Sequence, residues 1–80
     1  MTHEQVDEKV RASLAPQTME QLLHSWELTE AMPLTQAVAT TRGWLMDEFE
    51  RRDPAAFDRW MDNDYAQHPE KDTPRAWFSA

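Results

Sequence analysis

The sequence contains no cysteine, a single glycine and no apolar run long enough to cross a bilayer. Without cysteine, the chain cannot form a disulfide, a thiolate nucleophile or a cysteine-ligated zinc site, and it suits a reducing compartment. The first ten residues carry three acidic side chains, whereas a signal peptide has a basic start followed by an apolar stretch. We therefore expect a soluble cytoplasmic protein that does not enter a membrane.

Basic side chains are also scarce: eight Lys and Arg stand against fifteen Asp and Glu, for a net charge of −7. Such an acidic surface opposes direct binding to nucleic acid or anionic lipid, because both need cationic contacts. It favours encounter with a basic protein surface. The four Trp, three Phe and one Tyr argue against a disordered acidic tail, since they can build a core.

The spacing of prolines and apolar residues predicts helices. Prolines divide the 80 residues into helix-sized pieces, and the scarcity of glycine and of β-branched runs favours helix over sheet. Apolar residues recur every three or four positions in about residues 2–14, 18–30, 35–52 and 53–61. We predict an all-α fold, a small bundle of about four short helices over residues 1–64. A Pro-containing C-terminal tail, residues 65–80, follows and is either extended or packed back on the helices.

Capping residues support these boundaries. Thr18 and Gln21 form a capping-box pattern, Thr35 is a suitable N-cap, and Asp53-Pro54 provides an N-cap followed by proline at the first helical position. The residues expected on apolar helical faces are Val6, Val10, Leu14, Met19, Leu22, Leu23, Trp26, Val38, Leu45, Phe49, Phe57, Trp60 and Met61. Of these, we expect Trp26, Phe49 and Trp60 to be core residues.

Gly43 is unusual because glycine costs about 1 kcal/mol relative to alanine inside a helix. One interpretation is a close helix–helix contact or a bend between two shorter helices. The other is a notch where a partner approaches. The first is the more ordinary use of a small residue.

The sequence shows no pattern of catalytic or metal-binding residues. His3, His24 and His68 are not spaced to share a metal on one helix face, and Asp58 and Asp62 alone supply too few oxygen ligands. Neighbouring carboxylates exist, but no pocket or phosphate-binding glycine loop accompanies them. We expect no enzymatic activity, no metal and no cofactor.

Aromatic and acidic residues near the chain ends are the candidates for binding. Residues 1–30 carry six acidic and two basic side chains, residues 53–80 carry six and three, and residues 31–52 carry three of each. The neutral third helix should therefore be central. Trp44 lies at the edge of its apolar stripe. Trp77 and Phe78 follow Pro74 in the tail, where they either form a docking peptide or fold back to close the core.

The stretch Thr41 to Trp60, TRGWLMDEFERRDPAAFDRW, combines a helix, an Asp-Pro cap and a second helix. It resembles short acidic helical proteins of actinobacteria and of their phages and mobile elements. The resemblance covers about a quarter of the chain and carries no assigned activity or site residues. It implies an accessory or phage-encoded protein that occupies a surface of a larger host protein.

These observations lead to one main hypothesis and two alternatives. The main hypothesis is a non-enzymatic acidic module that inhibits or regulates a larger protein with a basic surface. Its expected partner-binding residues are Trp44, Asp58, Asp62, Asp64, Trp77 and Phe78. One alternative is a nucleic-acid mimic that blocks a basic groove, although several arginines interrupt the acidic helices. The other is a structural subunit that completes its thin core as a homodimer.

Overall fold

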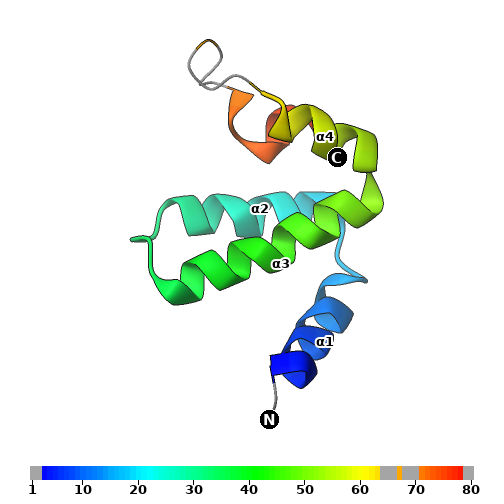
Figure 1. Cartoon of the computed structure of the whole chain (residues 1–80), viewed down its shortest axis with the longest axis vertical. Coiled ribbons are helices and arrows are strands. Elements are labelled where there is room, and N and C mark those ends of the chain that lie inside the picture. The colour runs from blue at the N-terminus through cyan, green and yellow to red at the C-terminus, as the bar shows by residue number, and fades with distance from the viewer. Residues whose placement is uncertain (1–2, 64–66, 68–70, 79–80) are drawn as a thin grey trace.

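The computed structural model describes residues 3–63, 67 and 71–78, and this part of the chain forms α-helices and no strand (Figure 1). The helices are α1 (His3–Leu14), α2 (Met19–Glu30), α3 (Gln36–Arg52) and α4 (Pro54–Met61), followed by a short 3-10 helix, η2 (Pro74–Ala76). The prediction of a small all-α bundle is confirmed, and the helix boundaries agree with the proline and capping pattern to within a residue or two.

Each predicted cap forms the expected hydrogen bonds. The backbone N–H of Gln21 donates to Thr18 Oγ1 at 3.1 Å, and the backbone N–H of Thr18 donates to Gln21 Oε1 at 2.8 Å, which completes the capping box of α2. Thr35 Oγ1 accepts from the N–H of Val38 at the start of α3. These bonds satisfy backbone donors that have no partner within the helix.

One residue joins α3 to α4. The backbone N–H of Asp53 donates to the carbonyl of Phe49 and ends α3. The Oδ1 atom of the same residue accepts from the N–H of Ala56 at 3.0 Å and begins α4, with Pro54 at the first helical position. The two helices therefore follow each other with no loop between them.

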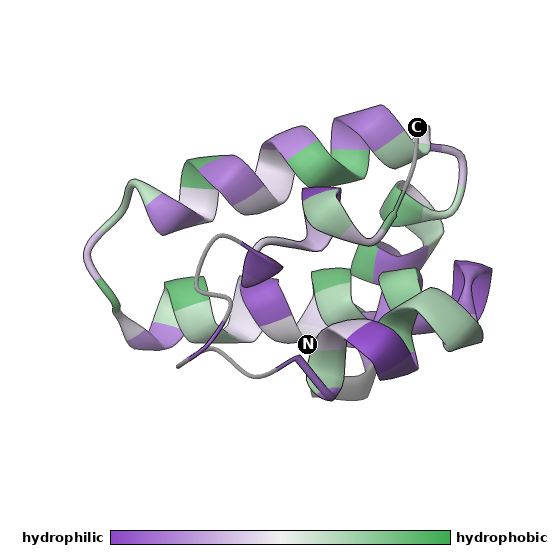
Figure 2. Ribbon diagram, turned by 90° about the horizontal axis from the view of Figure 1, so that it is seen from above, coloured by the Kyte–Doolittle hydropathy of each residue, from purple (hydrophilic) through white to green (hydrophobic). Residues whose placement is uncertain are grey.

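The helix α3 is central, as its balanced charge predicted. It packs against α1, α2 and α4, and it forms an antiparallel hairpin with α2 (Figures 1 and 2). The Nε of Arg42 donates to Thr29 Oγ1 at 3.0 Å, and its guanidinium lies 5.4 Å from the ring centre of Trp26. These contacts hold the two antiparallel helices together near their connection.

An aromatic cluster forms the core where α2, α3, α4 and the C-terminal segment meet. The ring centres of Trp26 and Trp60 are 5.1 Å apart and nearly perpendicular, and Phe49 lies 6.2 Å from Trp26 and 6.1 Å from Trp60. All three side chains are buried, so the prediction that they are core residues is confirmed. Phe78 completes the cluster, with its ring centre 4.9 Å from that of Phe49.

Two expectations from the sequence are wrong. Met61 does not join the apolar face of α4, since its side chain is 47% exposed while Ala56, Phe57 and Trp60 face the core. Gly43 does not mark a close contact or a bend, because α3 is continuous and an added Cβ would meet no atom within 4 Å. Spacing alone misplaced Met61, which is the last residue of its helix and falls outside the buried face.

Candidate partner-binding surface

The solvent-facing side of α4 brings together acidic and apolar side chains. Phe57 and Trp60 turn inward, so the residues on the other side of this short amphipathic helix are exposed. They include Asp58, Met61 and Asp62. We call these three residues the α4 surface.

The two carboxylates of the α4 surface lie at positions where a negative charge is electrostatically unfavourable. Asp58 and Asp62 are four residues apart, a spacing at which like charges on a helix repel each other. Asp62 is also the C-cap of α4, where the negative end of the helix dipole disfavours an anion. Neither side chain forms an ion pair with a described residue. The fold gains nothing visible from these charges, which is the kind of local conflict that often marks a functional surface.

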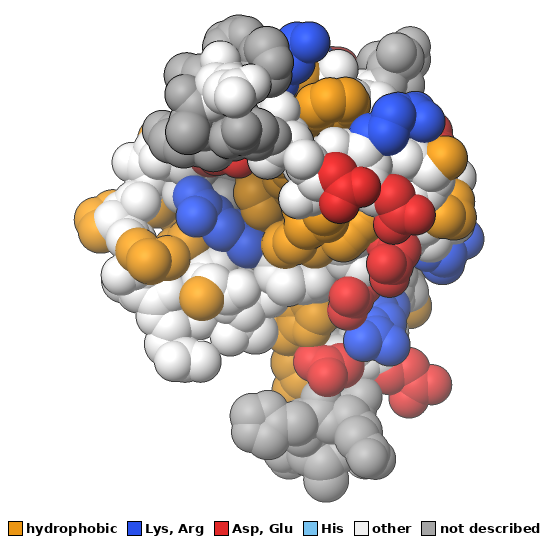
Figure 3. All heavy atoms as spheres, turned by 45° about the horizontal axis from the view of Figure 1, so that its top comes forward, with side chains coloured by type: hydrophobic (Ala, Val, Ile, Leu, Met, Phe, Trp, Pro, Cys, Tyr) orange, Lys and Arg blue, Asp and Glu red, His pale blue; other side chains and the backbone are white. Residues whose placement is uncertain are grey.

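The acidic character continues from α4 onto its neighbours. Glu50 on α3 is exposed and has no ion pair within the described residues, whereas Asp47 forms an exposed pair with Arg11 of α1 at 3.3 Å. Figure 3 shows acidic side chains in a broken line along one side of the molecule, interrupted by basic ones. The unpaired carboxylates of this side therefore lie at the junction of α3 and α4.

Trp44 belongs to the contact between α1 and α3 and not to the α4 surface. Its side chain is half-buried, and its Nε1 donates to Asp7 Oδ1 at 2.8 Å. The indole therefore has its polar atom satisfied and only part of its ring in solvent. The structure places Trp44 in a supporting position and does not bring it to Asp58 or Asp62.

The C-terminal residues follow the second of the two alternatives that the sequence left open. Phe78 is 2% exposed within the aromatic core, so it is not available as a surface anchor. Trp77 is half-buried, and its Nε1 donates to the carbonyl of Lys71 at 2.7 Å. Asp64, the remaining predicted site residue, lies outside the described residues.

An arginine that the sequence reasoning overlooked holds this segment in place. Arg75 donates two hydrogen bonds to Glu27 and two to Glu20, at 2.8 to 2.9 Å, from η2 to α2. These bonds raise the pKa of Arg75, and they lower the pKa of each glutamate below its usual value of 4.5. Glu20 and Glu27 are seven residues apart, two helical turns, and that spacing was the one sequence signal for a shared cationic partner.

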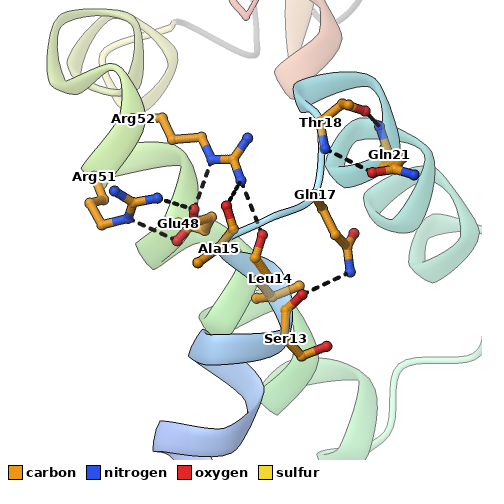
Figure 4. A network of polar contacts seen from close by, with 9 residues as sticks. All are labelled: Ser13, Leu14, Ala15, Gln17, Thr18, Gln21, Glu48, Arg51 and Arg52. Carbon is orange, nitrogen blue, oxygen red and sulfur yellow. Dashed lines mark hydrogen bonds and ion pairs between the residues drawn. The ribbon is translucent and has the colours of Figure 1, made fainter.

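A second overlooked network connects α1 to α3 (Figure 4). The carboxylate of Glu48 is nearly buried and accepts hydrogen bonds from Arg51 and from the Nε of Arg52 at 2.7 Å. Arg52 also donates to the carbonyls of Leu14 and Ala15 at the end of α1, at 3.0 and 3.1 Å. The hydrogen bonds from Arg51 and then Arg52 lower the pKa of Glu48, although burial opposes them.

This network ties α3 to the end of α1. Its signal in the sequence was the place of Glu48 between Leu45 and Phe49 on the buried face, with two arginines one turn later. Among the described residues, no group of three or more histidines and carboxylates is arranged to hold a metal ion. Within the same residues, none of the helices combines the length and apolar character needed to cross a membrane.

Comparison of the chain with models of protein families, with curated proteins and with solved structures gave no match.

Proposed function

We propose that this chain is a non-enzymatic binding module that docks its acidic α4 surface on a basic surface of a larger protein. The observation that carries the proposal is the pair Asp58 and Asp62, which are exposed, form no ion pair with a described residue and are unfavourable for the helix that bears them. A cationic partner would remove both conflicts at once. The resemblance of residues 41–60 to phage and mobile-element proteins suggests that the module inhibits or regulates a host protein.

The exposed Met61 gives this surface an apolar component next to the two carboxylates. Charge complementarity mainly speeds the encounter of two proteins, whereas apolar anchors mainly determine how long the complex lasts. Met61 is 47% exposed and its thioether side chain adapts to irregular surfaces. We therefore expect Asp58 and Asp62 to determine the association rate and Met61 to determine the dissociation rate.

The test begins by capturing the partner from cells with the tagged chain and continues with binding kinetics at several salt concentrations. Asp58→Asn with Asp62→Asn should lower the association rate about tenfold and flatten its dependence on salt. The matched control is Glu8→Gln with Glu30→Gln, which removes the same charge from other helices and should leave the rate within about twofold. Equal effects of both double variants would show that net charge alone matters, and the proposal would fail.

A measurement without a partner sharpens the same proposal. If the two aspartates are retained for binding at the expense of α4, Asp58→Asn with Asp62→Asn should raise the melting temperature slightly, followed by circular dichroism. A lower melting temperature would mean that the carboxylates stabilise the fold, and their unfavourable placement would no longer support a binding role.

A further inference from the structure

The connection between α2 and α3 exposes three large apolar side chains. Leu28 is 49% exposed, Met32 is 52% exposed and Leu34 is 75% exposed. We call these three residues the hairpin tip. Figure 2 shows this connection at the far left, away from both ends of the chain, and Figure 3 shows apolar side chains at the left of the molecule, apart from the acidic ones.

No described element covers the hairpin tip. The helix α1 meets α3 further along, at Trp44 and Asp47, and the C-terminal segment is tied to α2 at Glu20 and Glu27. Large apolar groups gain roughly 25 cal/mol for each Å² removed from water. Three large apolar side chains left in solvent at one end of a helical hairpin are therefore a candidate contact surface.

The lack of charged side chains in the connection between α2 and α3 indicates that the partner of the hairpin tip is a second copy of this chain. Residues 31–41 contain no charged side chain, although 29% of the whole chain is charged. A second copy that approached through the α4 surface would bring unpaired carboxylates against their own kind. At the hairpin tip this repulsion is weaker, because the connection itself is uncharged and Glu30 at the end of α2 is the nearest exposed carboxylate in the sequence. Exposed apolar side chains can also contact their own copies in a two-fold contact.

We propose that two copies of this chain associate through their hairpin tips, with Leu28, Met32 and Leu34 of one copy against the same residues of the other. The contact keeps the acidic sides of the two copies away from the interface. It also leaves both α4 surfaces accessible, so the dimer is bivalent toward a partner that has two basic sites. The inference rests on the apolar tip and not on the proposed function of α4.

The size of the patch determines the strength of the dimer. A stable interface buries about 800 Å² on each partner, about one seventh of the 5542 Å² that the whole chain exposes. Three side chains supply only part of such an area, even with the small residues around them. The association is therefore weak and depends on concentration. Added salt strengthens it, because salt screens the repulsion between two chains of charge −7.

Analytical ultracentrifugation of the full chain tests the proposal. The average mass should rise from 9.4 kDa toward twice that value as concentration increases, and it should rise further at high salt. Leu34→Glu and Met32→Glu should each weaken association by at least about tenfold, because each places a charge in an apolar contact. Both positions are exposed, so circular dichroism should show an unchanged fold.

Met61→Glu is the matched control, since it changes an equally exposed methionine on α4 and adds the same charge. Self-association should be unchanged in this variant. A mass that stays at 9.4 kDa at every concentration, an association that survives Leu34→Glu, or one that weakens with salt would each overturn the proposal. Because salt opposes the α4 contact and favours this one, failure of either proposal can be recognised separately.

Discussion

The two halves of α3 differ in what they contribute. The half that leads to α4 buries Leu45, Glu48 and Phe49, whereas the half that follows the hairpin tip buries only Val38. The first half meets α1, α2, α4 and the C-terminal segment, and the second contacts α2 through Arg42. One helix thus has a half that holds the fold together and a half that is mostly exposed.

The largest change in stability should come from truncating an aromatic residue that packs on the half of α3 that leads to α4. Trp60→Ala should destabilise the chain by about 3–5 kcal/mol, because it opens the core beside Phe49 and Trp26. Such a loss is a large part of a small domain's stability. The control is Leu34→Ala in the exposed hairpin tip, which should change stability by less than about 0.5 kcal/mol. Thermal melts that show similar losses for both variants would contradict the difference between the halves.

The next effect should come from the charge buried in the same half. Glu48→Gln keeps the shape of the side chain but removes the negative charge that Arg51 and Arg52 contact, at a cost of about 1–3 kcal/mol. Glu50→Gln, two residues away and exposed, should leave the stability nearly unchanged. Chemical unfolding monitored by tryptophan fluorescence measures both variants.

The carboxylate of Glu48 should also make the stability of the fold depend on pH in the acid range. The pKa of Glu48 is lowered in the folded chain, so its contribution to stability is fully present above the usual pKa of 4.5 and is lost as the pH falls below it. Glu20 and Glu27 act in the same direction. The melting temperature should therefore fall below about pH 4.5, and it should fall less steeply in Glu48→Gln. A parallel decline in both proteins would exclude Glu48 as a source of the pH dependence.

A smaller and more local effect should follow loss of the arginine that ties the C-terminal segment to α2. Arg75→Ala removes four hydrogen bonds to Glu20 and Glu27. The backbone N–H groups of Trp77 and Phe78, which donate to the carbonyl of Pro74, should then exchange with solvent faster by NMR. Arg59→Ala is the control, because Arg59 is exposed and forms no ion pair with a described residue. Unchanged exchange in Arg75→Ala would show that other contacts, such as the buried Pro74 and Phe78, hold the segment without Arg75.

The smallest effect should be a gain in stability from a substitution in the half of α3 that follows the hairpin tip. Gly43→Ala should stabilise the chain by about 0.5–1 kcal/mol, since alanine favours helix and its Cβ meets no neighbouring atom. A loss of stability would show that this position is constrained within the fold. If the variant is more stable but binds a partner less well, the notch at Gly43 lies in the interface.

The sequence predicted the parts of this fold that depend on local chemistry. Thr18, Thr35 and Asp53 marked the helix starts because a cap acts on backbone groups within three residues. The placement of Phe78 could not be decided in this way, because its burial depends on Phe49 and Trp60, which lie far away in the sequence. The partners of Arg75 were unpredictable for the same reason, since they are 48 and 55 residues distant.

The candidate site was predictable to a lesser degree. Asp58 and Asp62 were identified correctly as exposed residues of one helix, because helical spacing fixes which side chains share a face. Trp44 was a candidate surface residue because it lies at the edge of its apolar stripe, and Phe78 was left open between a docking peptide and a tail folded back on the core. Their neighbours come from other segments, Asp7 in one case and Phe49 in the other. Whether any of these residues binds a partner stays a prediction.

The double role of Asp53 limits how this protein can change in length. Since one residue ends α3 and begins α4, the joint contains no spare residue that could absorb an insertion or a deletion. Each residue of a helix advances about 100° around its axis. Lengthening α3 by one residue before this joint would turn α4 by that angle and carry Phe57 and Trp60 away from Phe49. We therefore expect lineages of this protein to keep the spacing from Phe49 to Trp60 constant.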